Sequence, residues 1–212
     1  MAFRILLLVL IGVANAAWAE GAGPARTALE AFAEGLETFQ AEFSQTVRSQ
    51  DGRLQDQTSG RIWLQVPDKL RWVYQGEFPE TIVADGENIW IHDVTLEQVT
   101  VKPQSDQASD SPLLVLADIS TLDDQFSVTE LGEFEDMALL ELRSLDAESE
   151  FERILLGFGD DGVRLMAMED AFGQRTEVQF SNATRNEPLP LELFTFTPPE
   201  GADVVGDPRF QQ

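Results

Sequence analysis

Residues 60–93, GRIWLQVPDKLRWVYQGEFPETIVADGENIWIHD, decide the fold. Three short apolar and aromatic runs are separated by Pro67-Asp68, by residues 76–79 and by Asp85-Gly86. Apolar residues alternate within the runs, which is the pattern of a half-buried strand, and Gly, Pro and Asp between the runs indicate turns. The stretch therefore predicts an antiparallel meander of short strands.

The large apolar residues of this meander share one face of each strand. They are Ile62, Leu64 and Val66 in the first run and Leu70, Trp72 and Tyr74 in the second. Arg71 falls on the opposite face, and no catalytic group lies among the apolar residues. We interpret their face as the wall of a pocket for lipid.

The composition limits both the class and the partners. The 212 residues include 38 acidic and 14 basic side chains, one His and no Cys, with a formal net charge of −24. This length suits one domain with a substantial core. Strong acidity argues against binding to nucleic acid or to anionic membrane surfaces, and it serves either solubility or attraction to a basic partner. Without Cys the chain cannot carry an N-terminal lipid, so it is not itself a lipoprotein.

The N-terminus has the pattern of a signal peptide. Arg4 precedes an apolar run at residues 5–13, and Ala17-Trp18-Ala19 forms an A-x-A cleavage site. The run is shorter than the roughly 20 residues of a membrane span, although an N-terminal anchor is the alternative. We predict export, removal of residues 1–19, and a single mature domain over residues 20–212.

Two helices are predicted outside the meander. Leu29, Phe32 and Leu36 recur at spacings of three and four, which predicts a helix from residue 25 to residue 37 or 38. Ser111-Pro112 is typical of a helix start, and the apolar run at residues 113–117 follows it. A short helix that is apolar nearly all round is buried or covers something apolar, and we expect this one to cover a pocket.

The remaining segments predict more strands in immediate succession. They lie at residues 39–47, 55–66, 96–101, 125–130, 137–143, 151–158, 163–169 and 176–182, and the Pro-rich tail at residues 187–201 predicts a loop with one helical turn near residues 191–194. Short turns without intervening helices imply an antiparallel sheet. A sheet of about eleven strands curls because twist accumulates. We therefore predict a mainly β fold, a curved antiparallel sheet with a lid of two or three helices.

Motifs for catalysis or metal binding are missing from the sequence. One His and no Cys exclude a His/Cys metal cluster, and there is no G-x-S-x-G, no phosphate-binding Gly-rich loop with Lys and no H-E-x-x-H. His92 precedes Asp93, but a lone His in a strand is more typical of a surface position. Asp160-Asp161-Gly162 lacks the spaced oxygen ligands of a calcium loop. We predict no catalytic residue, no metal and no cofactor, and hence not an enzyme.

Several short motifs occur together in a specific order. They are Phe39-x-Ala41-x-Phe43-Ser44-Gln45-x-Val47, Gly60-x-x-Trp63-Leu64-x-x-Pro67 followed by Trp72, TIVADGENIW at residues 81–90, Glu97-Gln98, Ser111-Pro112-Leu113, and FTFTPPEG at residues 194–201. In this order and spacing the mature chain resembles the family of periplasmic outer-membrane lipoprotein carriers, LolA.

The resemblance implies a half-open barrel closed by a helical lid, in the periplasm. Its pocket takes the acyl chains of a lipoprotein released by an inner-membrane ABC transporter and passes the cargo to an outer-membrane receptor, without nucleotide in the carrier. We expect a monomer that binds no nucleic acid. The expected lipid-binding residues of wall and lid are Leu36, Phe39, Phe43, Ile62, Leu64, Val66, Leu70, Trp72, Ile82, Leu113 and Leu116.

One position departs from the family pattern. Many members have a basic residue before the proline matched by Pro67, and it hydrogen-bonds the lid backbone. This chain has Val66 there. An apolar side chain cannot donate those bonds, so either another residue replaces it or the lid is held by packing. We expect mainly apolar contact.

Three other interpretations of the same residues are open. The half-barrel could bind or sense another lipid in the periplasm. Paired carboxylates such as Asp93 and Glu97 could serve an acid-dependent hydrolase, which requires a pocket lined by ionisable groups. The apolar residues could instead form the closed core of a structural domain, because periodicity alone does not distinguish a filled core from a pocket wall.

Overall fold

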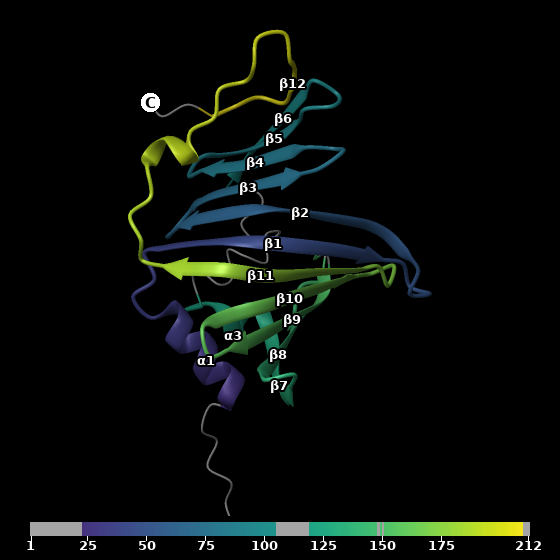
Figure 1. Ribbon diagram of the computed structural model, residues 1–212, viewed down its shortest axis with the longest axis vertical. Coiled ribbons are helices and arrows are strands. Elements are labelled where there is room, and N and C mark those ends of the chain that lie inside the picture. Colours follow the sequence, from purple (N-terminus) through teal and green to yellow (C-terminus); the bar gives the residue numbers. More distant parts are fainter. Residues whose placement is uncertain (1–22, 105–118, 148, 150, 210–212) are drawn as a thin grey trace, which may run out of the picture.

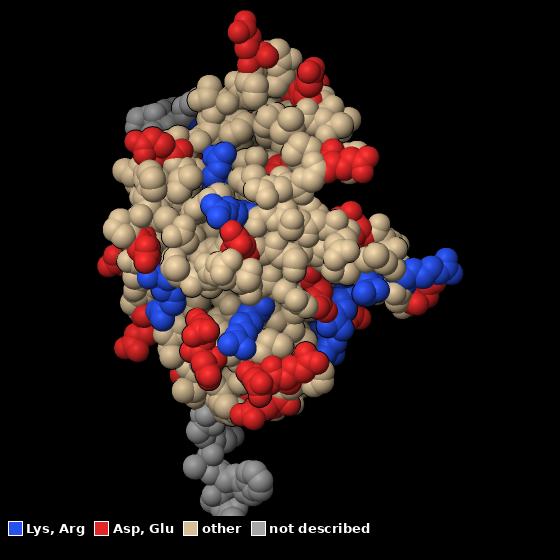
Figure 2. Space-filling model, viewed as in Figure 1, with Lys and Arg blue, Asp and Glu red and all other residues tan. Residues whose placement is uncertain are grey.

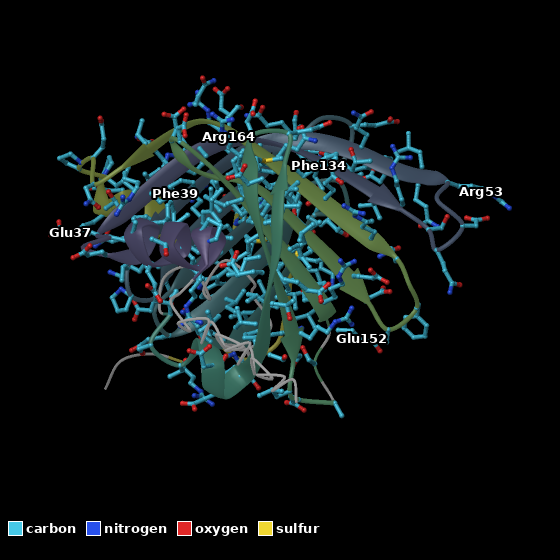
Figure 3. The ribbon with its side chains drawn as sticks, turned by 90° about the horizontal axis from the view of Figure 1, so that it is seen from below. Glu37, Phe39, Arg53, Phe134, Glu152 and Arg164 are labelled. Atoms are coloured by element: carbon cyan, nitrogen blue, oxygen red, sulfur yellow. The ribbon has the colours of Figure 1, made fainter. Side chains whose placement is uncertain are left out.

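A computed structural model describes residues 23–104, 119–147, 149 and 151–209 of the chain. Its main element is one twelve-stranded sheet that curves over the side chains of its concave side (Figure 3). The strands are β1 (Thr38–Arg48), β2 (Leu54–Gln65), β3 (Lys69–Gln75), β4 (Glu80–Asp85), β5 (Asn88–Asp93), β6 (Gln98–Pro103), β7 (Phe126–Phe134), β8 (Met137–Ser144), β9 (Phe151–Gly159), β10 (Gly162–Asp170), β11 (Arg175–Arg185) and β12 (Asp203–Val205).

The strand order shows how the chain builds this sheet (Figure 1). Neighbours follow the sequence β12-β6-β5-β4-β3-β2-β1-β11-β10-β9-β8-β7. All pairs are antiparallel except β12 with β6. The central strand β1 pairs with β2 on one side and β11 on the other, so it joins the two halves. Within the described residues β12 and β7 are edges, and the sheet is open. The predicted fold, mainly β with a curved antiparallel sheet, is confirmed with twelve strands instead of eleven.

The described helices are short. They are α1 (Pro24–Ala33), α3 (Leu122–Gln125) and the 3₁₀ turn η2 (Leu191–Phe194), which confirms the predicted turn in the tail. The helix α1 ends about four residues earlier than predicted, because Gly35 adopts a left-handed φ of 62° and Thr38 already pairs with Gln65. The predicted helix at residues 111–117 and the predicted signal peptide, residues 1–19, lie outside the described residues.

The C-terminal segment is more ordered than the predicted loop. It adds β12 beside β6 and places Phe196 and Ala202 on the outer face of the sheet. There the two residues cover a small apolar cluster made of Val83, Trp90, Val99 and Val101. The strand β12 has only three residues, all exposed, so it leaves no recognisable pattern in the sequence. It forms by pairing with the free edge of β6.

The main core lies on the opposite, inner face. Alternate residues of the strands contribute to it, and α1 packs there against β7–β10 (Figure 1). The buried residues of α1, which are Ala25, Leu29 and Phe32, face the strands. The helix covers the concave side of the second half of the sheet. The inner faces of β2–β5 therefore make no major contact with α1.

Gly60 allows two strands to approach closely on this inner face. It pairs with Phe43 of β1 and with Tyr74 of β3. A Cβ atom at this position would clash with the carbonyl oxygen of Val73 and lie 2.9 Å from the Phe43 ring. The ring of Phe43 thus occupies the space that a side chain would need, and Gly is required here by contact, not by a turn.

Replacement of Gly60 by Ala is expected to destabilise the protein by about 1–3 kcal/mol, because the added methyl group overpacks the sheet. Chemical denaturation measures this change. Ser59→Ala, at the exposed neighbouring position, is the matched control and should change stability far less. Equal stability of the two variants would contradict the assigned contact.

Candidate functional site

Nine of the eleven predicted pocket residues are described, and all nine meet in one apolar cluster on the inner face. They are Leu36, Phe39, Phe43, Ile62, Leu64, Val66, Leu70, Trp72 and Ile82. All of them are buried except Val66 and Ile82, which are partly buried at the margin. The other two, Leu113 and Leu116, lie outside the described residues. The nine side chains thus lie in one apolar cluster, and their lipid-binding role stays a prediction.

Strand pairing makes these side chains into a continuous wall. Ile62 of β2, Trp72 of β3 and Ile82 of β4 are direct neighbours across three strands. Leu64 pairs with Phe39 of β1, which lies beside α1 (Figure 3). Side chains of paired residues stand about 5 Å apart on the same face. The wall therefore presents an unbroken apolar surface from β1 to β4.

Three aromatic rings lie at one part of the wall. The Phe43 ring meets the Trp72 ring edge to face at a centroid distance of 4.9 Å, and it meets Tyr74 at 5.3 Å. The rings of Trp72 and Tyr74 stack at 5.8 Å. Such contacts add to the stabilisation from burial. They also fix the indole of Trp72 in one orientation on the inner face.

Polar groups begin beyond these rings, toward the β3–β4 turn. The Tyr74 hydroxyl donates to Oε1 of Gln45 at 3.3 Å, and burial raises the pKa of Tyr74. Glu80 and Asp93 are paired across β4 and β5 on the same face. Burial, together with the charge of Asp93, raises the pKa of Glu80. The inner face thus changes from apolar to acidic along the strands.

The N-terminal end of α1 is fastened by an ion pair and by hydrogen bonds from its backbone. The guanidinium of Arg26 donates to both carboxylate oxygens of Asp123, at 2.7 and 2.8 Å. The carboxylate of Glu130 accepts hydrogen bonds from the backbone N–H groups of Ala25 and Arg26, which satisfies donors at the helix start. The pKa of Asp123 is lowered by the hydrogen bonds from Arg26. Helix α1 is therefore tied to α3 and β7.

The C-terminal end of α1 is held by β11. Arg185 donates a hydrogen bond to the carbonyl oxygen of Glu34 at 3.0 Å, and its guanidinium lies 5.3 Å from the centre of the Phe32 ring. The Asn186 amide donates to the carbonyl of Gly35 and accepts from the N–H of Glu37. These bonds resemble what the family pattern implies for a basic residue at the position of Val66.

The expectation of a lid held mainly by apolar contact is therefore incomplete. Val66 does pack at the margin of the apolar cluster, and its N–H donates to the carbonyl oxygen of Glu37. Apolar contacts of Leu29 and Phe32 with the sheet are also present. However, polar bonds fix both ends of α1. The other expected lid segment, residues 111–117, lies outside the described residues.

A bulge in β11 explains why the alternation of residues in the sequence does not predict that Arg185 lies on the inner face. The register shifts between Gln40 and Glu42, so a step of three residues along β11 corresponds to a step of two along β1. Asn182 sits in this bulge with a positive φ of 51°. One extra residue exchanges the two faces of a strand. Arg185, which simple alternation from Phe180 would place outside, is thereby brought beside Phe39 on the inner face.

The described residues give no support to the hydrolase interpretation. His92 and Asp93 point to opposite faces, because they are successive residues of β5, and the His92 ring lies 5.8 Å from Phe196 on the outer face. Asp93 accepts a hydrogen bond from the N–H of Leu96. Within the described part of the chain, no three His, Cys, Asp or Glu side chains are placed to hold a metal ion.

Comparison with known proteins identifies the family. The sequence matches the family described as "Outer membrane lipoprotein carrier protein LolA" over residues 34–197. The chain belongs to the LolA family. The resemblance found in the sequence motifs is thus confirmed, and LolA is a family of carrier proteins, not of enzymes. None of the helices in the described ranges is long and apolar enough to cross a membrane.

Relatives that align over most of the chain share this family description. The outer-membrane lipoprotein carrier protein of Dechloromonas aromatica (strain RCB) is 43% identical over 179 residues, covering 84% of this chain and 86% of that protein. The one from Xanthomonas campestris pv. campestris (strain B100) is 40% identical over 185 residues, covering 86% and 88%. The one from Methylococcus capsulatus (strain Bath) is 34% identical and covers 97% and 99%.

Solved structures share the fold at low sequence identity. An uncharacterized conserved protein from Thermus thermophilus aligns with a TM-score of 0.53 and 13% identity, over 84% of this chain and 97% of that chain. MucB aligns with a TM-score of 0.50 and 18% identity, over 87% of this chain and 66% of that chain. At such identities the likeness concerns the fold alone.

Replacement of Arg185 by Ala should loosen the C-terminal end of α1, because it removes the bond to Glu34 and the contact with Phe32. We expect amide hydrogen exchange in residues 29–36 to become roughly tenfold faster, which corresponds to the loss of about one hydrogen bond. Arg175→Ala, on the same strand but paired at the surface with Glu177, is the control. Unchanged exchange in α1 of the Arg185 variant would refute the assigned role.

Glu80→Gln should stabilise the protein at neutral pH. The pKa of Glu80 is raised in the folded state by burial and by Asp93, so its ionised form opposes folding above that pKa. As the pH falls through the raised value, protonation relieves this cost. Thermal unfolding at pH 7.5 and pH 4 should therefore show an advantage for the variant that shrinks at low pH. Glu77→Gln, in the exposed preceding turn, is the matched control.

Proposed function

We propose that this protein carries acylated lipoproteins through the periplasm. In this proposal residues 1–19 are a cleaved signal peptide and residues 20–212 form one carrier domain. An inner-membrane ABC transporter supplies the cargo, and an outer-membrane lipoprotein receptor accepts it. The observation that carries the proposal is the apolar inner wall of β1–β4 on an open sheet, in a chain of the LolA family.

The physical demand on such a carrier is set by its cargo. Burial of an acyl chain contributes about 0.8 kcal/mol per CH₂ group, so one chain of ~16 carbons is worth roughly 12 kcal/mol. A protein that takes up such a chain must offer a comparably apolar surface. The continuous wall of Ile62, Trp72 and Ile82 with its neighbours supports this role.

The proposed lipid-binding set keeps all the residues expected from the sequence. The wall consists of Phe39, Phe43, Ile62, Leu64, Val66, Leu70, Trp72 and Ile82, and the lid supplies Leu36, Leu113 and Leu116. In this scheme α1 is fixed to the second half of the sheet by polar bonds at both ends. The wall on the first half is then the surface that receives acyl chains.

The surface charge fits a soluble shuttle. The formal net charge is −24, and Figure 2 shows acidic side chains scattered over the visible face instead of gathered in one patch. Such charge disfavours adhesion to anionic membranes. On this face the acids do not mark a single docking site, which supports a role in solubility.

The proposal predicts that an acylated protein co-purifies with the carrier from periplasm. Ile82→Glu should reduce the recovered cargo at least tenfold, because a carboxylate in the wall would have to lose its hydration when an acyl chain binds. Thr81→Glu, the neighbouring position on the outer face of β4, is the matched control. Mass spectrometry of the bound material after organic extraction identifies the cargo.

Two results would contradict the proposal. Recovery of phospholipid or free fatty acid in place of an acylated protein would favour a binder of another lipid. Equal recovery of cargo with the Ile82 and Thr81 variants would show that the wall does not bind the cargo. Circular dichroism of both variants verifies that each retains the fold.

A further inference from the structure

Trp72 has a buried hydrogen-bond donor without an acceptor. The residue is 8% exposed, and its indole nitrogen Nε1 has no hydrogen-bond partner among the described residues. The side chain belongs to the apolar cluster of the inner face, between Ile62 of β2 and Ile82 of β4. The orphaned N–H therefore lies within the proposed lipid-binding wall.

Another tryptophan of the same sheet provides a direct comparison. Trp90 is 7% exposed, and its Nε1 donates to Oδ2 of Asp85 at 2.8 Å. It lies on the outer face, in the cluster covered by Phe196. Buried indole N–H groups usually find a partner, and a buried donor without one is a rare and costly feature. The two residues are equally buried, so burial does not explain why only Trp72 lacks an acceptor.

The neighbours of Trp72 leave its donor few alternatives within the described part of the protein. The indole contacts the rings of both Phe43 and Tyr74, at centroid distances of 4.9 and 5.8 Å. The hydroxyl of Tyr74, the polar group among these rings, donates to Gln45 and accepts no hydrogen bond from the indole. Aliphatic side chains flank the indole on the adjacent strands. A bound molecule is therefore the natural source of an acceptor for this donor.

The location of the donor limits the chemistry of that molecule. Trp72 lies where the apolar wall ends, one step before Tyr74 and Gln45, and beyond them are the carboxylates of Glu80 and Asp93. A ligand that places its hydrocarbon along Ile62 and Leu64 would bring its polar end to this boundary. An uncharged acceptor suits the site better than an anion, which the two carboxylates would repel.

We propose that the indole N–H of Trp72 donates a hydrogen bond to the carbonyl oxygen of a fatty-acyl group. The acceptor belongs to the ester that joins the acyl chain to its headgroup. This inference rests on the proposed function and adds to it a polar specificity contact. Trp72 then recognises acyl linkage chemistry, whereas the surrounding side chains recognise only hydrocarbon.

The experiment compares two ligands that differ in the carbonyl groups alone. One is a synthetic peptide with an N-terminal S-(2,3-diacylglyceryl)cysteine, and the other is its dialkyl ether analogue. A neutral hydrogen bond corresponds to roughly a two- to tenfold difference in affinity. The full mature protein should therefore bind the ester peptide two- to tenfold more tightly than the ether peptide, as measured by calorimetry or fluorescence.

Substitutions of the two tryptophans test whether Trp72 causes the preference for the ester peptide. In Trp72→Phe, which keeps an aromatic ring but loses the donor, the ratio of ester to ether affinity should fall to about one. Trp90→Phe, on the outer face, should keep the wild-type ratio. Because the readout is a ratio within each variant, a general loss of affinity does not affect it. A preference retained by Trp72→Phe would overturn the inference.

A spectroscopic measurement on the unmutated chain serves if a variant fails to fold. In protein labelled with ¹⁵N-tryptophan, the Trp72 indole proton should shift downfield with the ester peptide and not with the ether peptide. Trp63→Phe and Trp90→Phe assign the resonance by elimination. Equal shifts or equal affinities for both peptides would overturn this inference alone. Failure to bind either peptide would overturn the proposed function and this inference with it.

Discussion

The structure depends on the apolar inner face of the sheet. Within the described residues the sheet does not close on itself, so closure does not cover this face. Twist curves the twelve strands, and β12 and β7 lie at opposite edges within the described residues. Helix α1 covers the half formed by β7–β10. The other half presents Ile62, Trp72 and Ile82 from successive strands. One sheet thus provides both a fixed platform and an apolar wall, and the long central strands β1 and β11 connect them.

Two backbone irregularities determine which groups reach the inner face. Gly60 leaves space above β2 that the Phe43 ring fills, and this contact places the ring against Trp72. The bulge at Asn182 exchanges the faces of β11, and it brings Arg185 to the end of α1. Both effects are local, but each sets a feature of the site: the first orders the aromatic end of the wall, and the second anchors the helix beside it.

The sequence predicted the features that follow from short-range periodicity. Alternation through Leu64 and Trp72 located the wall, and the turn residues between runs located the meander. The end of α1 was placed too late, because Gly35 and the pairing of Thr38 outweigh a helical spacing that continues to Leu36. The bulge, the role of Arg185 and the strand β12 were not predicted. Each depends on a register or an edge between segments far apart in the chain, and no local pattern encodes it.

The two apolar clusters of the sheet differ in how their polar groups are satisfied. On the outer face, Trp90 donates to Asp85, and Arg71 donates to the carbonyl oxygen of Leu193 in η2. These polar groups of the outer face thus have their hydrogen-bond partners within the protein, as in a closed core. On the inner face the Trp72 donor lacks an acceptor among the described residues, and Glu80 is held beside Asp93 with a raised pKa. If the inner face served stability alone, replacing these groups by apolar ones would raise the stability of the protein. If it receives a ligand, the same groups can bind the polar part of that ligand.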